Sequence, residues 1–205
     1  VTGDSAGAHL AAMVMLAKPW LAEQPWAGDD SPLTLSPSYV PADRSVAQLT
    51  QQGWFDVQAA VLSYGVFDVK ARAERGFETA SNGFWKWAKL TPRGLFGAAH
   101  SVQTRPDLYL AMSPLYQIPQ RSARQLPPQW VHVGSVDPTT SPASVQQYVQ
   151  VLQAAGQPVQ FQLYSGLNHA YLDNGCNAFL KMCFDRDAIA PLNDMLRFLR
   201  QTLGD

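Results

Sequence analysis

A short motif near the start of the chain constrains the fold more than any other feature. Residues 3–7 read Gly-Asp-Ser-Ala-Gly, a G-x-S-x-G pattern between an apolar strand end and an Ala-, Leu- and Met-rich helix from Ala6 to Lys18. A serine on so tight a strand-to-helix turn is exposed and its backbone is strained. Glycines two residues before and after it remove Cβ atoms that would clash. The pattern therefore predicts that Ser5 is a nucleophile at the carboxyl end of a strand.

The helix that begins at Ala6 adds a second chemical element to this turn. Its first backbone N–H groups lack partners within the helix and point toward Ser5, so the N–H of Ala6 could hold an oxyanion. The alternative is a glycine-softened helix start in which Ser5 is only a cap. The strand–turn–helix context favours the nucleophile.

Short apolar runs alternate with helical segments along the rest of the chain. Residues 59–64 and 130–134 are typical of buried parallel strands, and residues 159–164 alternate at strand period. Ser141 and Pro142 favour a helix start, and Gly156 suits the end of that helix. A last amphipathic helix carries one aliphatic stripe: Ile189, Leu192, Leu196, Leu199 and Leu203. Strands alternating with helices predict an α/β fold with a mostly parallel sheet flanked by helices.

Two stretches lack this regularity. Residues 19–56 are predicted to form a long irregular loop with a short helix near 42–51. Residues 69–112 are predicted to form an aromatic, partly helical insertion. Three aromatic residues there could line an acyl pocket, although the core of such an insertion needs rings in any case: Phe84, Trp85 and Trp87.

Composition narrows the classes of function. The 205 residues suit a single domain, residues 1–205, and 15 Lys and Arg against 16 Asp and Glu give no electrostatic case for binding nucleic acid. No apolar run approaches the roughly 20 residues that cross a bilayer. Only 15% of the residues are charged, which suggests buried or partner-covered surface. Because the chain opens on Val1, inside a motif, we expect it to be a piece of a longer protein.

The two cysteines exclude a disulfide scaffold and a four-thiolate metal site. Cys176 and Cys183 are seven residues apart, which on one continuous helix separates their Cα atoms by about 10.5 Å. That is too far for a disulfide. We therefore expect two free thiols, and a bridge only if the helix is broken there.

A serine nucleophile needs a base, and the chain offers four histidines. His9 lies one helical turn past Ser5 and is expected to pack. His132 lies inside an apolar strand and reads as a core residue, and His100 has no recognisable context. His169 follows the strand 159–164 across a short loop, so it lies at the same sheet edge as Ser5, where the ligands and catalytic groups of parallel sheets collect. His169 is the predicted base.

The acid is expected at the same edge of the sheet. Asp137 follows the second predicted strand and precedes the helix that Ser141 caps. The chain order Ser5, Asp137, His169 is the one expected of an α/β-hydrolase. Asp68 also lies at a strand end but comes one crossover too early, and is expected to anchor a turn. Asp4 is expected to be a structural ion-pair partner.

Together these residues resemble the hormone-sensitive-lipase-like group of α/β-hydrolase esterases. The resemblance rests on five segments in the family's order: residues 3–7, 64–68 (Tyr-Gly-Val-Phe-Asp), 113–115 (Ser-Pro-Leu), 137–138 (Asp-Pro) and 169–171 (His-Ala-Tyr). It implies the C-terminal portion of that fold, with Ser5 as nucleophile, Asp137 as orienting acid and His169 as base. Residues 69–112 would form part of a cap over the acyl pocket.

The chain departs from the family's pattern at four places. Ala8 and Ala170 stand where the family commonly has Gly, and residues 139–141 lack its second acidic residue. The His-Gly-Gly segment that supplies other oxyanion donors lies upstream of the nucleophile in the family, as do the early strands of the sheet. Since a lost oxyanion donor typically costs ~10²–10³ in kcat, residues 1–205 alone are expected to be nearly inactive.

The resulting hypothesis is hydrolysis of small-molecule carboxylic esters with short or medium acyl chains through an acyl-enzyme. No metal ion or organic cofactor is required. Two alternatives stay open: a hydrolase of the same fold that acts on amides, lactones or thioesters, and a catalytically silent module that binds a ligand or protein partner. The natural substrate, the compartment and the oligomeric state are left open.

Overall fold

The computed structural model describes residues 1–17 and 39–204. Lys18, at the end of the first predicted helix, and residues 19–38 of the predicted loop lie outside the described residues. The short helix expected near 42–51 is present as α2 (Val46–Gln51), which begins at Ser45 through a capping box with Gln48.

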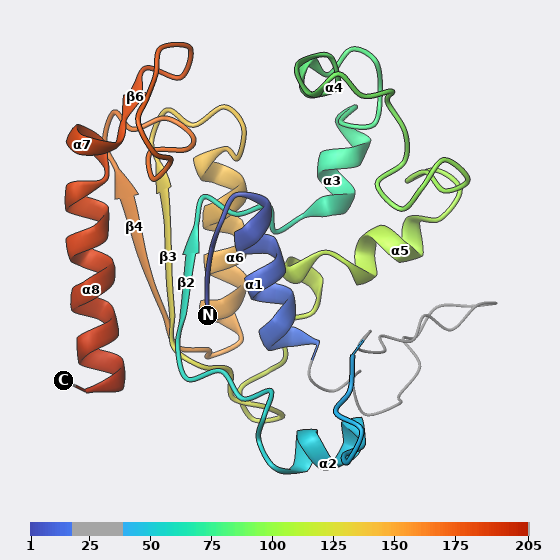
Figure 1. Ribbon diagram of the computed structural model, residues 1–205, viewed down its shortest axis with the longest axis vertical. Coiled ribbons are helices and arrows are strands. Elements are labelled where there is room, and N and C mark those ends of the chain that lie inside the picture. Colours follow the sequence, from blue (N-terminus) through green and yellow to red (C-terminus); the bar gives the residue numbers. More distant parts are fainter. Residues whose placement is uncertain (18–38, 205) are drawn as a thin grey trace.

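Within the described residues, four parallel strands form the central sheet. They are β1 (Thr2–Asp4), β2 (Ala60–Ser63), β3 (Gln129–Gly134) and β4 (Val159–Tyr164), and their order in the sheet follows their order in the chain. The three pairings are all parallel, which confirms the predicted class of fold. In Figure 1 the strand arrows point the same way, and the loops that follow them gather at one edge.

Helices cover both faces of this sheet because the strands alternate their side chains between them. On one face Leu62 and Val131, which are paired in register, pack with the helices α1 (Ala6–Leu16) and α6 (Pro142–Ala154). On the other face Val61 packs with Phe198 of α8 (Ile189–Leu203). The sheet is therefore the middle layer of three, and the loops at its carboxyl edge remain free to carry functional side chains.

Helix α6 begins and ends where its sequence predicts. Ser141 is the N-cap and accepts a hydrogen bond from the backbone N–H of Ser144, and Pro142 is the first helical residue. Gly156, just past the end, has φ +71°, the left-handed backbone that glycine adopts without strain.

Helix α8 presents a different face to the sheet from the one its aliphatic stripe suggests. The buried residues are Pro191 and Phe198, with Met195 and Leu199 partly buried beside them. Four members of the stripe are instead 40–57% exposed: Ile189, Leu192, Leu196 and Leu203. The Phe198 ring meets Trp130 on the sheet at a centroid distance of 6.0 Å.

The region between β2 and β3 is partly helical, as predicted. It contains α3 (Val69–Glu74), α4 (Gly83–Ala88), α5 (Pro106–Ala111) and the 3₁₀ turn η2 (Pro114–Tyr116). In Figure 1 the segment from α3 to α5 lies to the side of α1, opposite to α8. It has a small apolar cluster of its own: Val69, Ala73, Val102, Leu108 and Tyr109. Its role as a cap over an acyl pocket stays a prediction, as does the assignment of residues 1–205 to a single domain.

The expectation of two free thiols is wrong. The chain between His169 and α8 contains a two-stranded antiparallel hairpin, β5 (Cys176–Asn177) and β6 (Met182–Cys183), followed by α7 (Phe184–Asp187). The register places Cys176 opposite Cys183 with their Cα atoms 3.9 Å apart, and a disulfide joins them. The expectation assumed a continuous helix, and the hairpin removes that assumption.

No helix within residues 1–17 and 39–204 is both long and apolar enough to cross a bilayer.

Candidate active site

Ser5 occupies the turn between β1 and α1. Its backbone angles are φ +50° and ψ −116°, a region that non-glycine residues rarely adopt. The backbone N–H of Ser5 donates to the carbonyl of Ser63 at 2.9 Å, which fastens the turn to the end of β2. The strained serine predicted from the motif is therefore present, and it is held by the neighbouring strand.

The two glycines of the motif differ in how much room their positions leave for a side chain. A Cβ on Gly3 would lie 2.2 Å from the carbonyl oxygen of Gly7, so no other residue fits at position 3 unless the turn moves. A Cβ on Gly7 would meet only Asp4 Oδ1, at an ordinary 3.6 Å. The prediction that both glycines avoid a clash is thus correct for Gly3 and wrong for Gly7. Gly7 contributes the carbonyl group that lies too close to position 3 for any residue with a Cβ.

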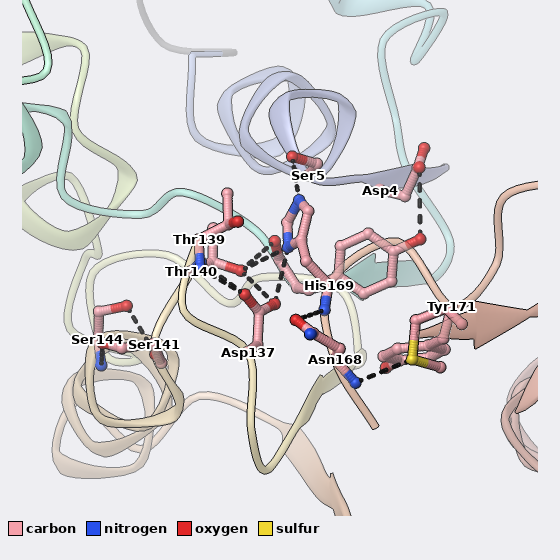
Figure 2. Close-up of polar contacts among 12 residues, drawn as sticks. Asp4, Ser5, Asp137, Thr139, Thr140, Ser141, Ser144, Asn168, His169 and Tyr171 are labelled. Carbon is pink, nitrogen blue, oxygen red and sulfur yellow. Dashed lines mark hydrogen bonds and ion pairs between the residues drawn. The ribbon is translucent and has the colours of Figure 1, made fainter. Parts of the chain in front are cut away.

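His169 lies in the loop that follows β4, at the same edge of the sheet. Its Nε2 is 3.0 Å from Ser5 Oγ and its Nδ1 is 2.7 Å from Asp137 Oδ2 (Figure 2). The backbone N–H of His169 donates to Asn168 Oδ1. An ionised carboxylate accepts from Nδ1–H, and this leaves the lone pair of Nε2 directed at the hydroxyl of Ser5.

Asp137 is fully buried, yet donors surround its carboxylate. Oδ1 accepts the backbone N–H groups of Thr139 and Thr140 at 2.7 and 2.9 Å. Oδ2 accepts the Thr140 hydroxyl at 2.9 Å in addition to His169. The side chain of Asp137 is 0% exposed, and such a buried charge requires partners of this kind.

A close backbone contact brings the acid and the base together. A Cβ on Gly134, at the end of β3, would lie 2.1 Å from the carbonyl oxygen of Leu167. Because Gly134 has none, the turn after β3 and the loop after β4 touch, and the backbone N–H of Val136 donates to Leu167 at 3.1 Å. The loops that carry Asp137 and His169 are joined through their backbones.

The other histidines have separate partners. His9 Nε2 contacts the carbonyl of Met112 at 2.7 Å, and burial lowers its pKa. His132 lies in the core, where Nε2 contacts Ser63 Oγ at 2.8 Å and Nδ1 contacts the Tyr171 hydroxyl. Burial lowers the pKa of His132 to about 3, so its imidazole is neutral. The backbone N–H of His100 donates to Gly97 in a turn.

The two competing carboxylates also have structural partners. Asp68 caps α3 by accepting the backbone N–H of Ala71 at 2.8 Å, and it accepts the Tyr116 hydroxyl at 3.0 Å. It therefore anchors a turn, as predicted. Asp4 accepts a hydrogen bond from the Tyr64 hydroxyl at 3.4 Å, so the partner found for it is a neutral phenol where an ion pair was expected.

The three aromatic residues proposed for the acyl pocket contact one another. Trp85 is buried, and its indole N–H donates to the carbonyl of Phe77, whose ring also lies beside Trp85 and Phe84. Trp87 is 81% exposed and touches Phe84. Among the described residues no ring contact joins these side chains to His169. Their place in a pocket stays a prediction, as does the oxyanion role of Ala6, the first residue of α1.

Sequence reasoning did not find several neighbours of the site. The Tyr64 ring packs edge-on against His169 and Tyr171, with centroids 4.9 and 4.8 Å apart. Burial raises the pKa of both tyrosines, so both hydroxyls stay protonated. The resemblance covered segments 64–68 and 169–171, which was the available signal for these rings. Thr140 carried no such signal.

A cavity of about 360 Å³ opens between the segment that begins at Ala170 and the β5–β6 hairpin. Its lining is mostly small and polar: Ala170, Asp173, Asn174, Gly175, Cys176, Asn177, Ala178 and Met182. Burial first, and then the nearby charge of Asp4, raises the pKa of Asp173. The described residues include no group of three or more His, Cys, Asp or Glu side chains that could hold a metal ion.

Fold and site together define an α/β protein that carries a Ser–His–Asp hydrogen-bonded chain on a strand-to-helix turn. A profile of the family described as having the alpha/beta hydrolase fold matches residues 1–173, and the chain belongs to that family. Comparison with curated protein sequences gives no match.

Solved structures with the same fold include esterases. The chain is 16% identical to a thermophilic esterase of Thermogutta terrifontis, with a TM-score of 0.54. The matched region covers 98% of this chain and 53% of the esterase chain. The butyrate-bound form gives 18% identity, a TM-score of 0.55, and coverage of 98% and 55%. A truncated carbohydrate esterase from gut microbiota gives 17%, 0.57, and coverage of 82% and 51%. The chain therefore spans about half the length of these structures.

Proposed function

We propose that the protein is a serine hydrolase that cleaves carboxylic esters with short to medium acyl chains. The observation that carries the proposal is the unbroken hydrogen-bonded chain from Ser5 Oγ through both nitrogens of His169 to Asp137. A strained serine beside a buried His–Asp pair is the arrangement used for nucleophilic acyl transfer on this fold.

The geometry supports a two-step reaction. Ser5 Oγ attacks the ester carbonyl carbon while His169 Nε2 takes the hydroxyl proton, and Asp137 stabilises the imidazolium. The bond to the alcohol oxygen breaks, and the alcohol leaves with the proton from His169. Water then attacks the acyl-serine ester through the same proton route, which releases the carboxylic acid and restores Ser5.

The oxyanion formed in each step needs donors. The backbone N–H of Ala6, at the start of α1, is the donor we assign within this chain. The family resemblance assigns further donors to a segment upstream of the nucleophile turn. We therefore propose that activity belongs to the full-length gene product.

Two comparisons support short esters as the substrate class. The Thermogutta terrifontis esterase has been determined with propionate and with butyrate bound. The same enzyme is phosphorylated by paraoxon. These findings concern that protein, and they motivate the choice of substrates and of covalent probe for this one.

The test compares the wild-type full-length protein with Ser5→Ala on p-nitrophenyl acetate, butyrate and octanoate. We expect Ser5→Ala to lower kcat by about 10⁴-fold or more, as removal of a serine nucleophile does elsewhere. Replacement of the exposed Ser122 by Ala is the matched control and should leave the rate unchanged.

Paraoxon labelling separates an enzyme from a silent binding module. We expect peptide mass spectrometry to find the phosphoryl adduct on Ser5 in the wild type and in Ser122→Ala, and on neither serine in Ser5→Ala. Equal ester hydrolysis by wild type and Ser5→Ala, with no adduct, would contradict the proposal. Turnover of amides, lactones or thioesters in preference to esters would change the proposed substrate class and leave the proposed Ser–His–Asp site unchanged.

A further inference from the structure

We propose that Thr140 is the residue that positions the Asp137–His169 pair for catalysis. This inference rests on the proposed function and extends it to a side chain outside the Ser–His–Asp chain. Thr140 is 3% exposed, and its hydroxyl lies 2.9 Å from Asp137 Oδ2, 2.9 Å from the carbonyl oxygen of Tyr64 and 3.3 Å from His169 Nδ1 (Figure 2).

The chemistry of these partners decides how the hydroxyl bonds. It has one proton to donate, whereas an ionised carboxylate and a carbonyl oxygen can only accept. The charged Asp137 makes the stronger acceptor, because hydrogen bonds to ionised groups are shorter and stronger than neutral ones. His169 Nδ1 lies 2.7 Å from Asp137 Oδ2 and 3.3 Å from the hydroxyl oxygen of Thr140, so its N–H donates to the carboxylate. The hydroxyl therefore stands where the acid and the base meet.

The two oxygens of Asp137 are held by different parts of the chain. Oδ1 is fixed by the backbone N–H groups of Thr139 and Thr140, which any residue would supply at those positions. Oδ2, the oxygen that faces His169, has the Thr140 hydroxyl as its other donor. The Thr140 hydroxyl therefore adds, at the oxygen that faces Nδ1, a second restraint on the rotation of the carboxylate about its Cβ–Cγ bond, beside the one at Oδ1.

The hydroxyl also lies against the end of the neighbouring strand. Tyr64 follows β2 with a backbone φ of +39°, which is uncommon for a non-glycine residue, and its ring packs against His169. The carbonyl of Tyr64 is within hydrogen-bond distance of Thr140. Thr140 thus contacts the end of β2, the turn after β3 and the loop after β4, the three places that must keep register for the pair to stay aligned.

The experiment uses the full-length protein with three substitutions. Thr140→Val keeps the shape of the side chain and removes the hydroxyl, and Thr140→Ser keeps the hydroxyl. Ser113→Ala is the matched control, because it removes a fully buried hydroxyl that bonds to Tyr109 and Val69. The measurements are kcat and KM on p-nitrophenyl butyrate, and the melting temperature.

We expect Thr140→Val to lower kcat about 10- to 100-fold, the effect of losing a hydrogen bond to a charged group, with KM changed less than about threefold. Thr140→Ser should restore most of kcat. Ser113→Ala should lower the melting temperature and keep kcat. Wild-type kcat in Thr140→Val, or a Thr140→Ser variant as slow as Thr140→Val, would overturn the positioning role.

Two further comparisons keep the outcomes distinct. If Thr140→Val does not fold, Thr140→Ala against Thr140→Ser isolates the same oxygen atom. Loss of the fold in both hydroxyl-free variants, while Thr140→Ser folds, would show that the hydroxyl serves folding and would overturn the proposal. A wild type no faster than Ser5→Ala contradicts the proposed function itself, whereas an active wild type with an equally active Thr140→Val contradicts only the role of Thr140.

Discussion

At the carboxyl edge of the sheet, neighbouring turns touch through backbone atoms, whereas the segment from α3 to α5 packs its own side chains into a separate cluster. The contact of Gly134 with Leu167 and the bond from Ser5 to Ser63 belong to the first region. The cluster around Val69 and Tyr109 belongs to the second. The close backbone approach at Gly134 leaves no room for a Cβ, while a side-chain cluster can be repacked. The geometry of the site is therefore set by the sheet edge.

The largest expected effect comes from a matched pair of glycines in the two regions. Gly134→Ala places a Cβ 2.1 Å from the Leu167 carbonyl oxygen, so the loops that carry Asp137 and His169 must separate. We expect a loss of about 4 kcal/mol in the free energy of unfolding, together with loss of ester hydrolysis. Urea denaturation and p-nitrophenyl butyrate hydrolysis measure both.

The control is Gly83→Ala in α4, where a Cβ would meet nothing within 4 Å. It should change stability by less than about 1 kcal/mol, since alanine is the better helix former. Similar losses in the two variants would break the proposed contrast between the regions.

A smaller effect is expected from two tryptophans of the α4 helix. Trp85 is 6% exposed and Trp87 is 81% exposed. Trp85→Ala should lower the free energy of unfolding by about 3 kcal/mol because it empties a buried site, and Trp87→Ala should leave it nearly unchanged.

Kinetics on acyl chains of increasing length add a second measurement on the same variants. A change in chain-length preference in Trp87→Ala would place this segment over the acyl pocket. Unaltered kinetics in both variants would argue against the cap assignment of residues 69–112.

The smallest effect is a pH dependence that originates beneath the site. Burial lowers the pKa of His132 to about 3, below the value of 6.5 in the unfolded chain. Between these pH values the unfolded chain binds a proton on His132 that the folded chain does not bind. The folded state therefore keeps its full stability above pH 6.5, and the free energy of unfolding decreases progressively as the pH falls from 6.5 toward 3. Between pH 7 and pH 5 the loss is about 2 kcal/mol.

Urea denaturation of wild type and His132→Gln at these pH values isolates this contribution, because every other titrating group is shared. Tyr171→Phe, which removes the hydroxyl beside His132 and keeps the imidazole buried, should retain the wild-type slope. A His132→Gln variant as sensitive to pH as the wild type would contradict the assignment.

Much of the fold could be predicted because its signals are local. The apolar runs of β2 and β3, the alternation in β4 and the Ser141–Pro142 start of α6 each depend on a few consecutive residues. Predictions that depended on packing were less reliable. The expectation of free thiols at Cys176 and Cys183 was wrong, because the two residues meet only when the hairpin forms. The aliphatic stripe of α8 did not show which face of that helix packs on the sheet.

Local patterns in the sequence are enough to place Ser5 on a strand-to-helix turn, and Asp137 and His169 after strands at the same edge, because parallel strands end on one side of a sheet. The tertiary structure alone shows that the Thr140 hydroxyl lies between Asp137 and the end of β2. Thr140 and Tyr64 are 76 residues apart, and the Thr140 hydroxyl lies 2.9 Å from the Tyr64 carbonyl oxygen only because β2 and β3 pair side by side. Sequence patterns report the order of elements, and the alignment of a buried carboxylate depends on atoms that meet only after folding.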